Sequence, residues 1–338
     1  PGNRGTNRQG LYDLYDAPVG VDLRIETANK SKPLLISETE WEGGGQFGVS
    51  SIWRTNGQYH MLYSAYPPKS EAVVCYAISD DGYNWIRPEL NQVEFKGSKK
   101  NNIVVDGPGG GSFEDPKGLP EERFKAIGEE GFWIDPDDGE ILENDEAEKR
   151  FSAQEYEGAA YKGPKVQLRG QLMSWVSPDR IHWKKVEEPV AEFPSDGGGS
   201  PHYDTDKDMY FAYIRVHGLP PGETIGIGSG NPETDTPRRA IGISRTRDFR
   251  KWLPPKLILF PDAQDPMDVS FYGCDYFNYP GRKDLHGMFL EIYHQLTDQV
   301  DTQIAFSRDG LAWCRPERKP IVPLGATDSG EQCMVYPS

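Results

Sequence analysis

Four acidic residues stand where they could perform acid–base chemistry. Asp115 lies in the run SFEDPKG, Asp268 lies in MDVSFYGCD, and Glu331 lies in TDSGEQC. Asp196 flanks the first strand expected in its segment. A carboxylic acid and a carboxylate in different environments can act as proton donor and as base or nucleophile. We therefore predict Asp115, Asp268, Glu331 and Asp196 as catalytic candidates, although an Asp-Pro pair such as 115–116 is also typical of a plain turn.

Charged and aromatic side chains elsewhere in the chain are candidates for ligand binding. Arginine and histidine can hold a carboxylate, sulfate or phosphate group, and aromatic rings can form flat platforms. For any single cation, a structural salt bridge is the simpler interpretation. The predicted binding residues are Glu42, Trp53, Arg54, His202, Arg215, Tyr272, Asp275, His294 and Asp328.

The sequence predicts neither a metal centre nor a cofactor. No pair of cysteines has CxxC spacing, and no Cys/His cluster has zinc spacing. A structural calcium ion would be compatible with many folds, but no DxDxDG loop supports one. The four cysteines are expected to be buried thiols, with a single disulfide as the alternative; they are Cys75, Cys274, Cys314 and Cys333.

Charge and composition narrow the choice of partner. The net charge is −16, which disfavours nucleic acid and anionic membrane surfaces because both need basic patches. The sequence contains no run of 18 apolar residues, so it predicts no transmembrane helix. The chain opens on Pro1 without a signal peptide, so we expect a processed or trimmed form. The oligomeric state is left open.

A repeated sequence pattern indicates the strands that must position these residues. The run YAISDDGYNW ends at Trp85, and related runs end at Trp183, Trp252 and Trp313. Each has an alternating apolar stretch, a serine, a turn rich in Asp, Gly or Arg, and then the tryptophan. Alternation indicates a half-buried strand, and a large aromatic ring suits packing between sheets. We expect all four tryptophans to occupy equivalent, largely buried places.

The spacing of the repeat predicts a modular all-β architecture. Each module reads as four antiparallel strands, which is one blade of a β-propeller. We predict a five-bladed propeller over 47–338, after an N-terminal extension over 1–46, with an incomplete fifth blade and almost no helix. The predicted modules cover residues 47–99, 112–190, 198–258, 268–322 and, in part, 327–338.

Two runs are similar to those of a known group of proteins. SDDGYNWIRPELNQVEFKGSKKNNIV spans residues 79–104, and PEERFKAIG spans residues 120–128. Together with the repeated tryptophans, they resemble the five-bladed β-propeller glycoside hydrolases, broadly families 32, 43, 68, 117 and 130. The closest resemblance is to uncharacterised bacterial glycosyl-hydrolase-like proteins. Such a resemblance implies a carbohydrate substrate and an extracellular or periplasmic location.

The resemblance also implies roles for particular residues. Related propellers carry a sugar-binding Asp in an Arg-Asp-Pro strand, which matches Asp115 except that Glu114 replaces the arginine. Their general acid lies in a Glu-Cys pair, which Glu331 approaches through Glu-Gln-Cys. They place the nucleophilic Asp in the first strand, but FGVSSIW at 47–53 contains no acid. The nucleophile or base is therefore unassigned at this point.

Three functions are compatible with these observations. The leading hypothesis is a glycoside hydrolase with paired carboxylates at the mouth of the propeller channel. The second is a glycoside phosphorylase, for which Lys117, Arg215 and His294 could supply a phosphate pocket. The third is a carbohydrate-binding propeller without catalytic activity, favoured by the missing acid in the first module. A carboxyl pair in one pocket would favour hydrolysis.

Overall fold

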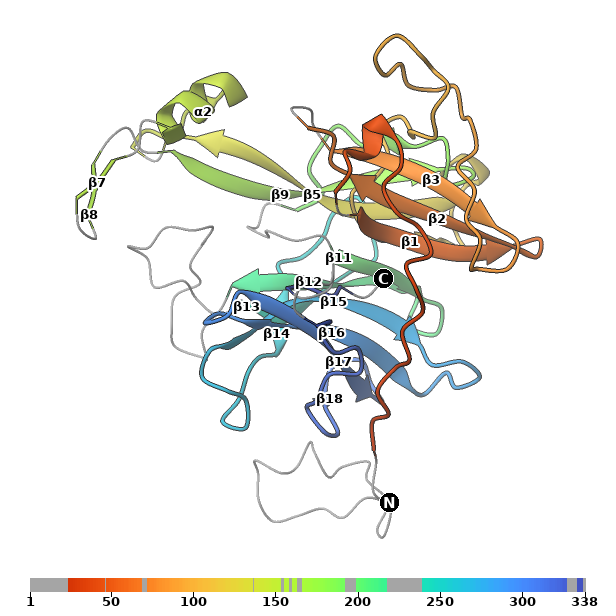
Figure 1. Ribbon diagram of the computed structural model, residues 1–338. Coiled ribbons are helices and arrows are strands. Elements are labelled where there is room, and N and C mark those ends of the chain that lie inside the picture. The colour runs from red at the N-terminus through yellow and green to blue at the C-terminus, as the bar shows by residue number, and fades with distance from the viewer. Residues whose placement is uncertain are drawn as a thin grey trace.

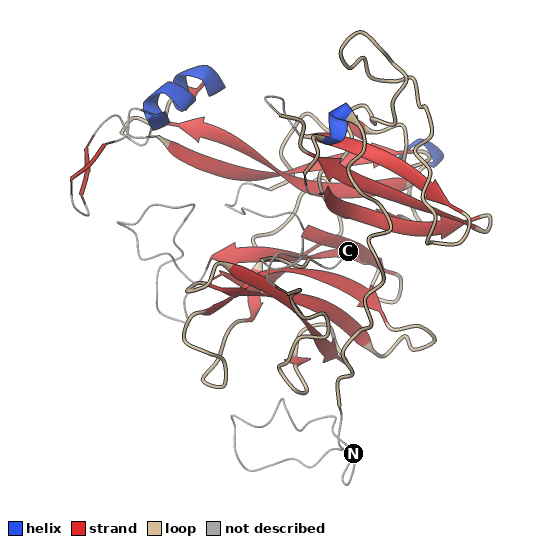
Figure 2. Ribbon diagram, viewed as in Figure 1, coloured by secondary structure: helices blue, strands red, loops and turns tan. Residues whose placement is uncertain are grey.

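The computed structural model describes residues 24–45, 47–68, 72–135, 137–152, 155–157, 160–162, 166–191, 199–217, 239–326 and 333–336. The predicted catalytic residues Asp196 and Glu331 and the predicted binding residue Asp328 lie outside these ranges. Strands dominate the described chain, which has one α-helix and two short 3-10 helices (Figure 2). The expectation of an all-β protein is confirmed. None of the described helices is long and apolar enough to cross a membrane.

Four antiparallel sheets follow one another along the chain as the blades of a propeller (Figure 1). In the first blade the strand order is β1-β2-β3, and a bridge between Ile78 and Ile86 begins a fourth strand. In the second blade the order is β10-β9-β5-β4. The strands of these two blades are β1 (Phe47–Thr55), β2 (Gln58–Ala65), β3 (Val73–Ser79), β4 (Ser112–Glu114), β5 (Phe124–Ile134), β9 (Gln167–Ser177) and β10 (Lys184–Lys185).

The third and fourth blades are regular four-stranded meanders, ordered β11-β12-β13-β14 and β15-β16-β17-β18. The first strands of the blades contact one another around the axis, β4 with β11 and β11 with β15. They are therefore the innermost strands, as a propeller requires. The strands of these blades are β11 (Gly199–Asp204), β12 (Met209–His217), β13 (Arg239–Thr246), β14 (Lys256–Leu259), β15 (Val269–Asn278), β16 (His286–His294), β17 (Gln299–Ser307) and β18 (Trp313–Cys314).

The second blade carries an arm that projects from the propeller. β5 and β9 pair along their whole lengths and extend beyond the blade (Figure 1). The end of this arm contains β6 (Ile141–Leu142), α2 (Asn144–Ser152), β7 (Glu155–Glu157) and β8 (Ala160–Lys162).

The repeated turn is held by the side chain that begins it. The hydroxyl of Ser79 accepts hydrogen bonds from the backbone N–H groups of Asp81 and Gly82. Ser177 and Ser307 bind their own turns in the same way. In the third blade, however, Thr246 accepts the bond from Asp248 N–H, whereas the hydroxyl of Ser244 donates to Leu253 O. Thr246 is therefore equivalent to the three serines. It lies six residues before Trp252, just as each serine lies six residues before the tryptophan of its own copy, whereas Ser244 lies eight residues before Trp252.

The tryptophans seal each blade against the blade before it. Trp183, Trp252 and Trp313 are 5–7% exposed, and each belongs to a core cluster shared with the preceding blade. Trp85 is only half-buried, so the expectation of four equally buried rings holds for three of them. Among the described residues, Trp85 belongs to a cluster of the first blade and the N-terminal segment, and no other blade contributes to that cluster. Trp85 packs beside Leu35 and Trp41 of the N-terminal segment instead.

That N-terminal segment, residues 24–42, runs from the fourth blade to the first (Figure 1). Ala28 N–H donates to Ile321 O beside the fourth blade at 2.7 Å. At its other end, Trp41 Nε1 donates to Asn102 Oδ1 at 2.7 Å. The short helix η1 (Glu40–Glu42) then leads into the first blade. The segment, which we call the strap, thus connects the two blades that are farthest apart along the chain.

Candidate functional site

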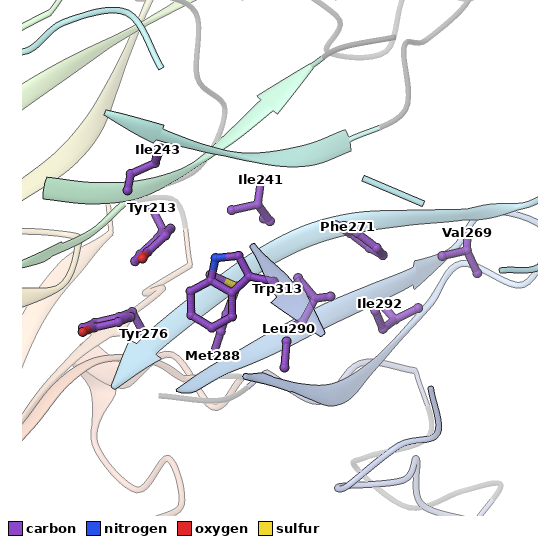
Figure 3. Close-up of a cluster of buried hydrophobic side chains, with 11 residues drawn as sticks. Tyr213, Ile241, Ile243, Val269, Phe271, Tyr276, Met288, Leu290, Ile292 and Trp313 are labelled. Atoms are coloured by element: carbon purple, nitrogen blue, oxygen red, sulfur yellow. The ribbon is translucent and has the colours of Figure 1, made fainter. Parts of the chain in front are cut away.

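Two carboxyl groups share one face of the fourth blade. The core cluster in Figure 3 takes Met288, Leu290 and Ile292 from β16, so the alternating residue Glu291 lies on the opposite face. Its cross-strand partner on β15 is Gly273, and Asp275 lies two residues further on the same face. Diagonal neighbours of this kind have Cα atoms about 7–8 Å apart. Both acids are half-buried.

A glycine makes room for the Glu291 carboxyl. A Cβ atom placed on Gly273 would lie 3.1 Å from Cδ of Glu291, and closer still to Oε2. Ordinary contacts between such atoms need about 3.5–4.0 Å. The carboxyl group therefore rests directly against the backbone of β15. The pairing register shifts between Phe271 and Gly273, so Tyr272 occupies a β-bulge immediately before this position.

Both carboxyl groups hold their protons more tightly than usual. Burial raises the pKa of Asp275 to about 7. Burial and the nearby Asp275 raise the pKa of Glu291 to about 8, against the opposing effect of Arg215. A carboxylic acid in a poorly solvated site favours its neutral form. Near neutral pH, Glu291 is therefore largely protonated while Asp275 is the more readily ionised of the two.

Cationic and aromatic side chains border this pair. Arg215, from β12 of the third blade, lies with its Cζ 4.1 Å from the ring centre of Tyr272. Arg239, from β13, lies 5.0 Å from the same ring and 5.5 Å from that of Tyr293. Tyr336 of the C-terminal segment approaches Tyr272 with a centroid distance of 5.9 Å. Two blades and the C-terminal segment therefore meet around Tyr272.

Three residues of this cluster are among those predicted from the sequence, namely Arg215, Tyr272 and Asp275. Glu291 and Arg239 were not predicted. The only signal for Glu291 in the sequence is a single acid in the otherwise apolar strand MFLEIYH at 288–294. Arg239 begins β13, a position that carries no signal of its own.

Asp115, the first catalytic candidate, occupies a different environment. It directly follows β4, and its side chain is completely buried. The ammonium group of Lys125 and the hydroxyl of Tyr210 both donate to its Oδ2. Burial acts to raise the pKa of Asp115, but these two hydrogen bonds, a third from Lys117 N–H and the charge of Lys125 together lower it. A role in anchoring the second blade to the third accounts for these contacts, and its catalytic role stays a prediction.

Glu42, a predicted binding residue, is likewise fully enclosed. It accepts hydrogen bonds from the hydroxyl of Tyr63 at 2.7 Å and from Nε of Arg87 at 2.6 Å. Backbone N–H groups of Glu38 and Thr39 also donate to it at 3.0 Å. Burial opposes these bonds, but together they lower the pKa of Glu42. This carboxylate therefore fixes the end of the strap to the first blade.

Other predicted residues lie at separate places. Trp53, on β1, stacks on His60 with a centroid distance of 5.3 Å, and the exposed Arg54 lies over Tyr59. His202, on β11, contacts Tyr276 with a centroid distance of 4.5 Å, and burial lowers its pKa to about 4, which keeps it neutral. Asp268 is half-buried in the turn before β15, where its carbonyl accepts from Gln295 N–H.

The three cations proposed for a phosphate pocket are not gathered in one place. Lys117 pairs with Asp208, just before β12, whereas Arg215 lies near the other end of that strand. Seven residues of strand span about 23 Å. His294 Nε2 contacts Asp301 Oδ2 at 2.7 Å at the end of β16.

The described residues contain neither a group that could hold a metal ion nor a disulfide bond. Within the part of the chain that the structure describes, no group of three His, Cys, Asp or Glu residues could hold a metal ion. All four cysteines are free thiols, and only Cys75 is fully buried. Burial raises the pKa of Cys75 to about 12, so it is unreactive as a nucleophile.

Comparison with known proteins supports the fold. No protein-family model and no curated protein match the sequence. A solved structure of a BT0996 RGII complex is 14% identical, with a TM-score of 0.51 over 92% of this protein and 83% of that one. An N-acetylgalactosamine deacetylase from F. plautii, in complex with blood group B trisaccharide, is 13% identical, with a TM-score of 0.51 over 86% and 74%.

A thermostable family-43 glycoside hydrolase is also similar, at 12% identity, with a TM-score of 0.47 over 83% of this protein and 76% of that one. At these identities the likeness concerns the fold alone. The two structures with a TM-score of 0.51 support the expected fold, and they support no more than the fold. The chemistry must be argued from the site, because one fold supports several reactions.

Proposed function

We propose that the protein hydrolyses glycosidic bonds in a poly- or oligosaccharide, with Glu291 and Asp275 as its catalytic pair. The observation that carries this proposal is the placement of two carboxyl groups with raised pKa on one face of the fourth blade, next to an aromatic and cationic cluster. Perturbed carboxyl groups of this kind are frequent at catalytic sites. Diagonal neighbours on one face of adjacent strands lie close enough for both side chains to reach one ligand.

The two acids take different roles because their pKa values differ. Glu291, protonated near neutral pH, donates its proton to the glycosidic oxygen as the leaving group departs. Asp275, ionised more readily, activates a water molecule or attacks the anomeric carbon. Arg215 lowers the pKa of Glu291, which keeps the proton available for transfer. Gly273 has no Cβ atom, which leaves the space beside the β15 backbone that the Glu291 carboxyl occupies.

The test is a glycan-panel assay of the wild type, Glu291→Gln and Asp275→Asn, each checked by melting curves. We expect both variants to remain folded and to lose at least about a hundredfold in turnover. Glu89→Gln, an exposed acid on the first blade, is the matched control and should retain activity. Equal turnover by Glu291→Gln and the wild type would refute the proposal.

The same assay tests the catalytic roles predicted from the sequence. If Asp115→Asn and Asp268→Asn abolish turnover in folded protein while Asp275→Asn does not, the acids of the second blade and of the turn before β15 are the catalytic ones. A phosphate-dependent product would favour a phosphorylase. Retention of a glycan without cleavage would favour a binding protein, an outcome consistent with the absence of any acid in β1.

We also propose that the ring has five positions, the fifth lying between the fourth and first blades. Two features support this proposal. The strap passes between these two blades, and the C-terminal segment adds Met334 to β17 through a parallel bridge with Val300. Of the predicted partial fifth module, 327–338, only residues 333–336 lie within the described residues. An experimental structure with four equally spaced blades closed directly on one another would refute this arrangement.

A further inference from the structure

A hollow lies between the third and fourth blades, at the ends of their strands that are remote from the carboxyl pair. Its walls come from the β11–β12 turn, the end of β13, the start of β16 and the turn after β17. Along β12, Met209 lines the hollow and Arg215 lies beside the carboxyl pair, and six residues of strand span about 20 Å. The hollow is therefore separate from the proposed catalytic site.

The floor of the hollow is apolar, and both blades hold it in place. Tyr213 and Ile243 lie at one end of the core cluster (Figure 3) and are 2% and 6% exposed. The hydroxyl of Tyr213 donates to Gly310 O of the fourth blade at 2.9 Å. Phe211 packs edge-on against Tyr213 with a centroid distance of 5.6 Å. A floor of aromatic and aliphatic side chains favours contact with C–H groups of a ligand.

One wall carries a histidine whose tautomer follows from its hydrogen bonds. The hydroxyl of Tyr276 has one proton, which it donates to Asn278 Oδ1 at 2.7 Å. His286 Nδ1 lies 2.7 Å from the same hydroxyl and must therefore be the donor in that contact. Burial and the charge of Lys207 lower the pKa of His286, so the ring is neutral near pH 7. A neutral ring protonated at Nδ1 leaves Nε2 as a hydrogen-bond acceptor.

The charged groups around the hollow supply donors and acceptors in equal number. Arg245 is half-buried, and its guanidinium makes neither a hydrogen bond nor an ion pair within the part of the chain that the structure describes. Lys207 pairs with Asp204 at 2.8 Å. Asp309 accepts backbone N–H groups of its own turn through Oδ1, which leaves Oδ2 as an acceptor. The formal charges of these two cations and two carboxylates cancel.

From this we infer that the hollow binds the edge of a neutral sugar, as a second glycan-binding site apart from the carboxyl pair. Its volume of about 20 Å³ exceeds the roughly 10–15 Å³ that one water needs, so a hydroxyl or hydroxymethyl group can enter. A sugar hydroxyl both donates and accepts, so it can accept from Arg245 and donate to His286 Nε2 or Asp309. Because the surrounding charges cancel, an anion gains no advantage. The inference does not depend on the proposed catalytic pair.

The experiment maps where a sugar protects the backbone from hydrogen exchange. The probes are glucose, galactose, xylose and arabinose, the trisaccharides of each, and galacturonate as the charged counterpart of galactose. We expect at least one neutral probe to protect residues 204–209 and 307–312, which form two walls of the hollow. Galacturonate should bind there no more tightly than galactose. Absence of protection by every neutral probe, or a preference of at least about tenfold for galacturonate, overturns the inference.

Variants identify the contact. The sugar concentration that gives half of the maximal protection at 204–209 reports the affinity of this site alone. Arg245→Gln should raise that concentration by about 10- to 100-fold, because a hydrogen bond to a charged group is lost. Arg247→Gln, an exposed arginine that does not line the hollow, is the matched control and should behave as the wild type. Equal affinities for Arg245→Gln and the wild type would contradict the assignment. If Arg245→Gln fails to fold, the protection map of the wild type decides.

The outcomes separate this inference from the proposed function. Protection of the hollow without cleavage of any glycan keeps the second site and refutes the hydrolase. Cleavage of a glycan, with protection confined to the strands around Glu291, keeps the hydrolase and refutes the second site.

Discussion

Replacement of Gly273 by alanine is the most direct test of the geometry of the site. The new Cβ would lie 3.1 Å from Cδ of Glu291 and closer still to Oε2, where an unstrained contact needs about 3.5–4.0 Å. The carboxyl group must therefore retreat by on the order of 1 Å. Displacement of a catalytic group by this distance can reduce the rate about a hundredfold.

The same substitution should leave the fold intact. Gly273 does not adopt the left-handed conformation that would make alanine strained. Its replacement also reduces the entropy of the unfolded chain, which contributes about 0.4–1 kcal/mol of stability. We therefore expect the free energy of unfolding to change by less than about 1 kcal/mol, since this gain offsets part of the crowding.

The assay compares kcat, its pH profile and the melting temperature of Gly273→Ala with those of the wild type. Gly109→Ala is the control, because a Cβ atom at that position would meet nothing within 4 Å. We expect kcat to fall while the melting temperature is preserved, and the alkaline limb of the profile to shift as the environment of Glu291 changes. A variant with wild-type kcat and an unshifted profile would contradict the role assigned to this glycine.

Three further predictions follow from other contacts. The pKa of Glu291 is about 8 in the folded protein and near its usual low value in the unfolded chain, so the free energy of unfolding should fall as pH rises from about 5 to 8. Calorimetry should show a weaker pH dependence of stability for Glu291→Gln. Asp115→Asn removes the partner of the buried Lys125 and should destabilise the protein by about 3–5 kcal/mol; chemical denaturation measures this, and an unchanged midpoint would contradict it. Thr246→Val should cost about 1–3 kcal/mol because Asp248 N–H loses its acceptor, whereas Thr246→Ser should be nearly neutral; equal melting temperatures for the two variants would show that the hydroxyl is not used.

The repeat was the part of the fold most readily predicted from the sequence. Its turn is local, since one hydroxyl and one aspartate satisfy N–H groups two or three residues away. Local chemistry of this kind leaves a signature that recurs in each blade. The third copy is the exception, because its sequence offers two hydroxyl residues, Ser244 and Thr246, and the hydrogen bond to Asp248 N–H shows that Thr246 holds the turn.

The candidate site was predicted only in part, because its properties depend on cross-strand and interblade contacts. Arg215, Tyr272 and Asp275 were selected for their residue types and places on strands. Glu291 acquires its raised pKa from burial and from Asp275 on the neighbouring strand, which the sequence around it does not reveal. The enclosure of Asp115 by Lys125 and Tyr210 is equally non-local, since Tyr210 belongs to another blade.

The strap changes how the blades depend on one another. In a linear array of repeats, each unit contacts only its neighbours, and the terminal units can fray independently. Here Glu42 is tied to Arg87 in the first blade while Ala28 is bonded to Ile321 beside the fourth. Loss of either terminal blade would therefore release an anchor of the other. We expect the ends of this array to open together rather than separately, which makes the first and fourth blades a single cooperative unit despite being the most distant in sequence.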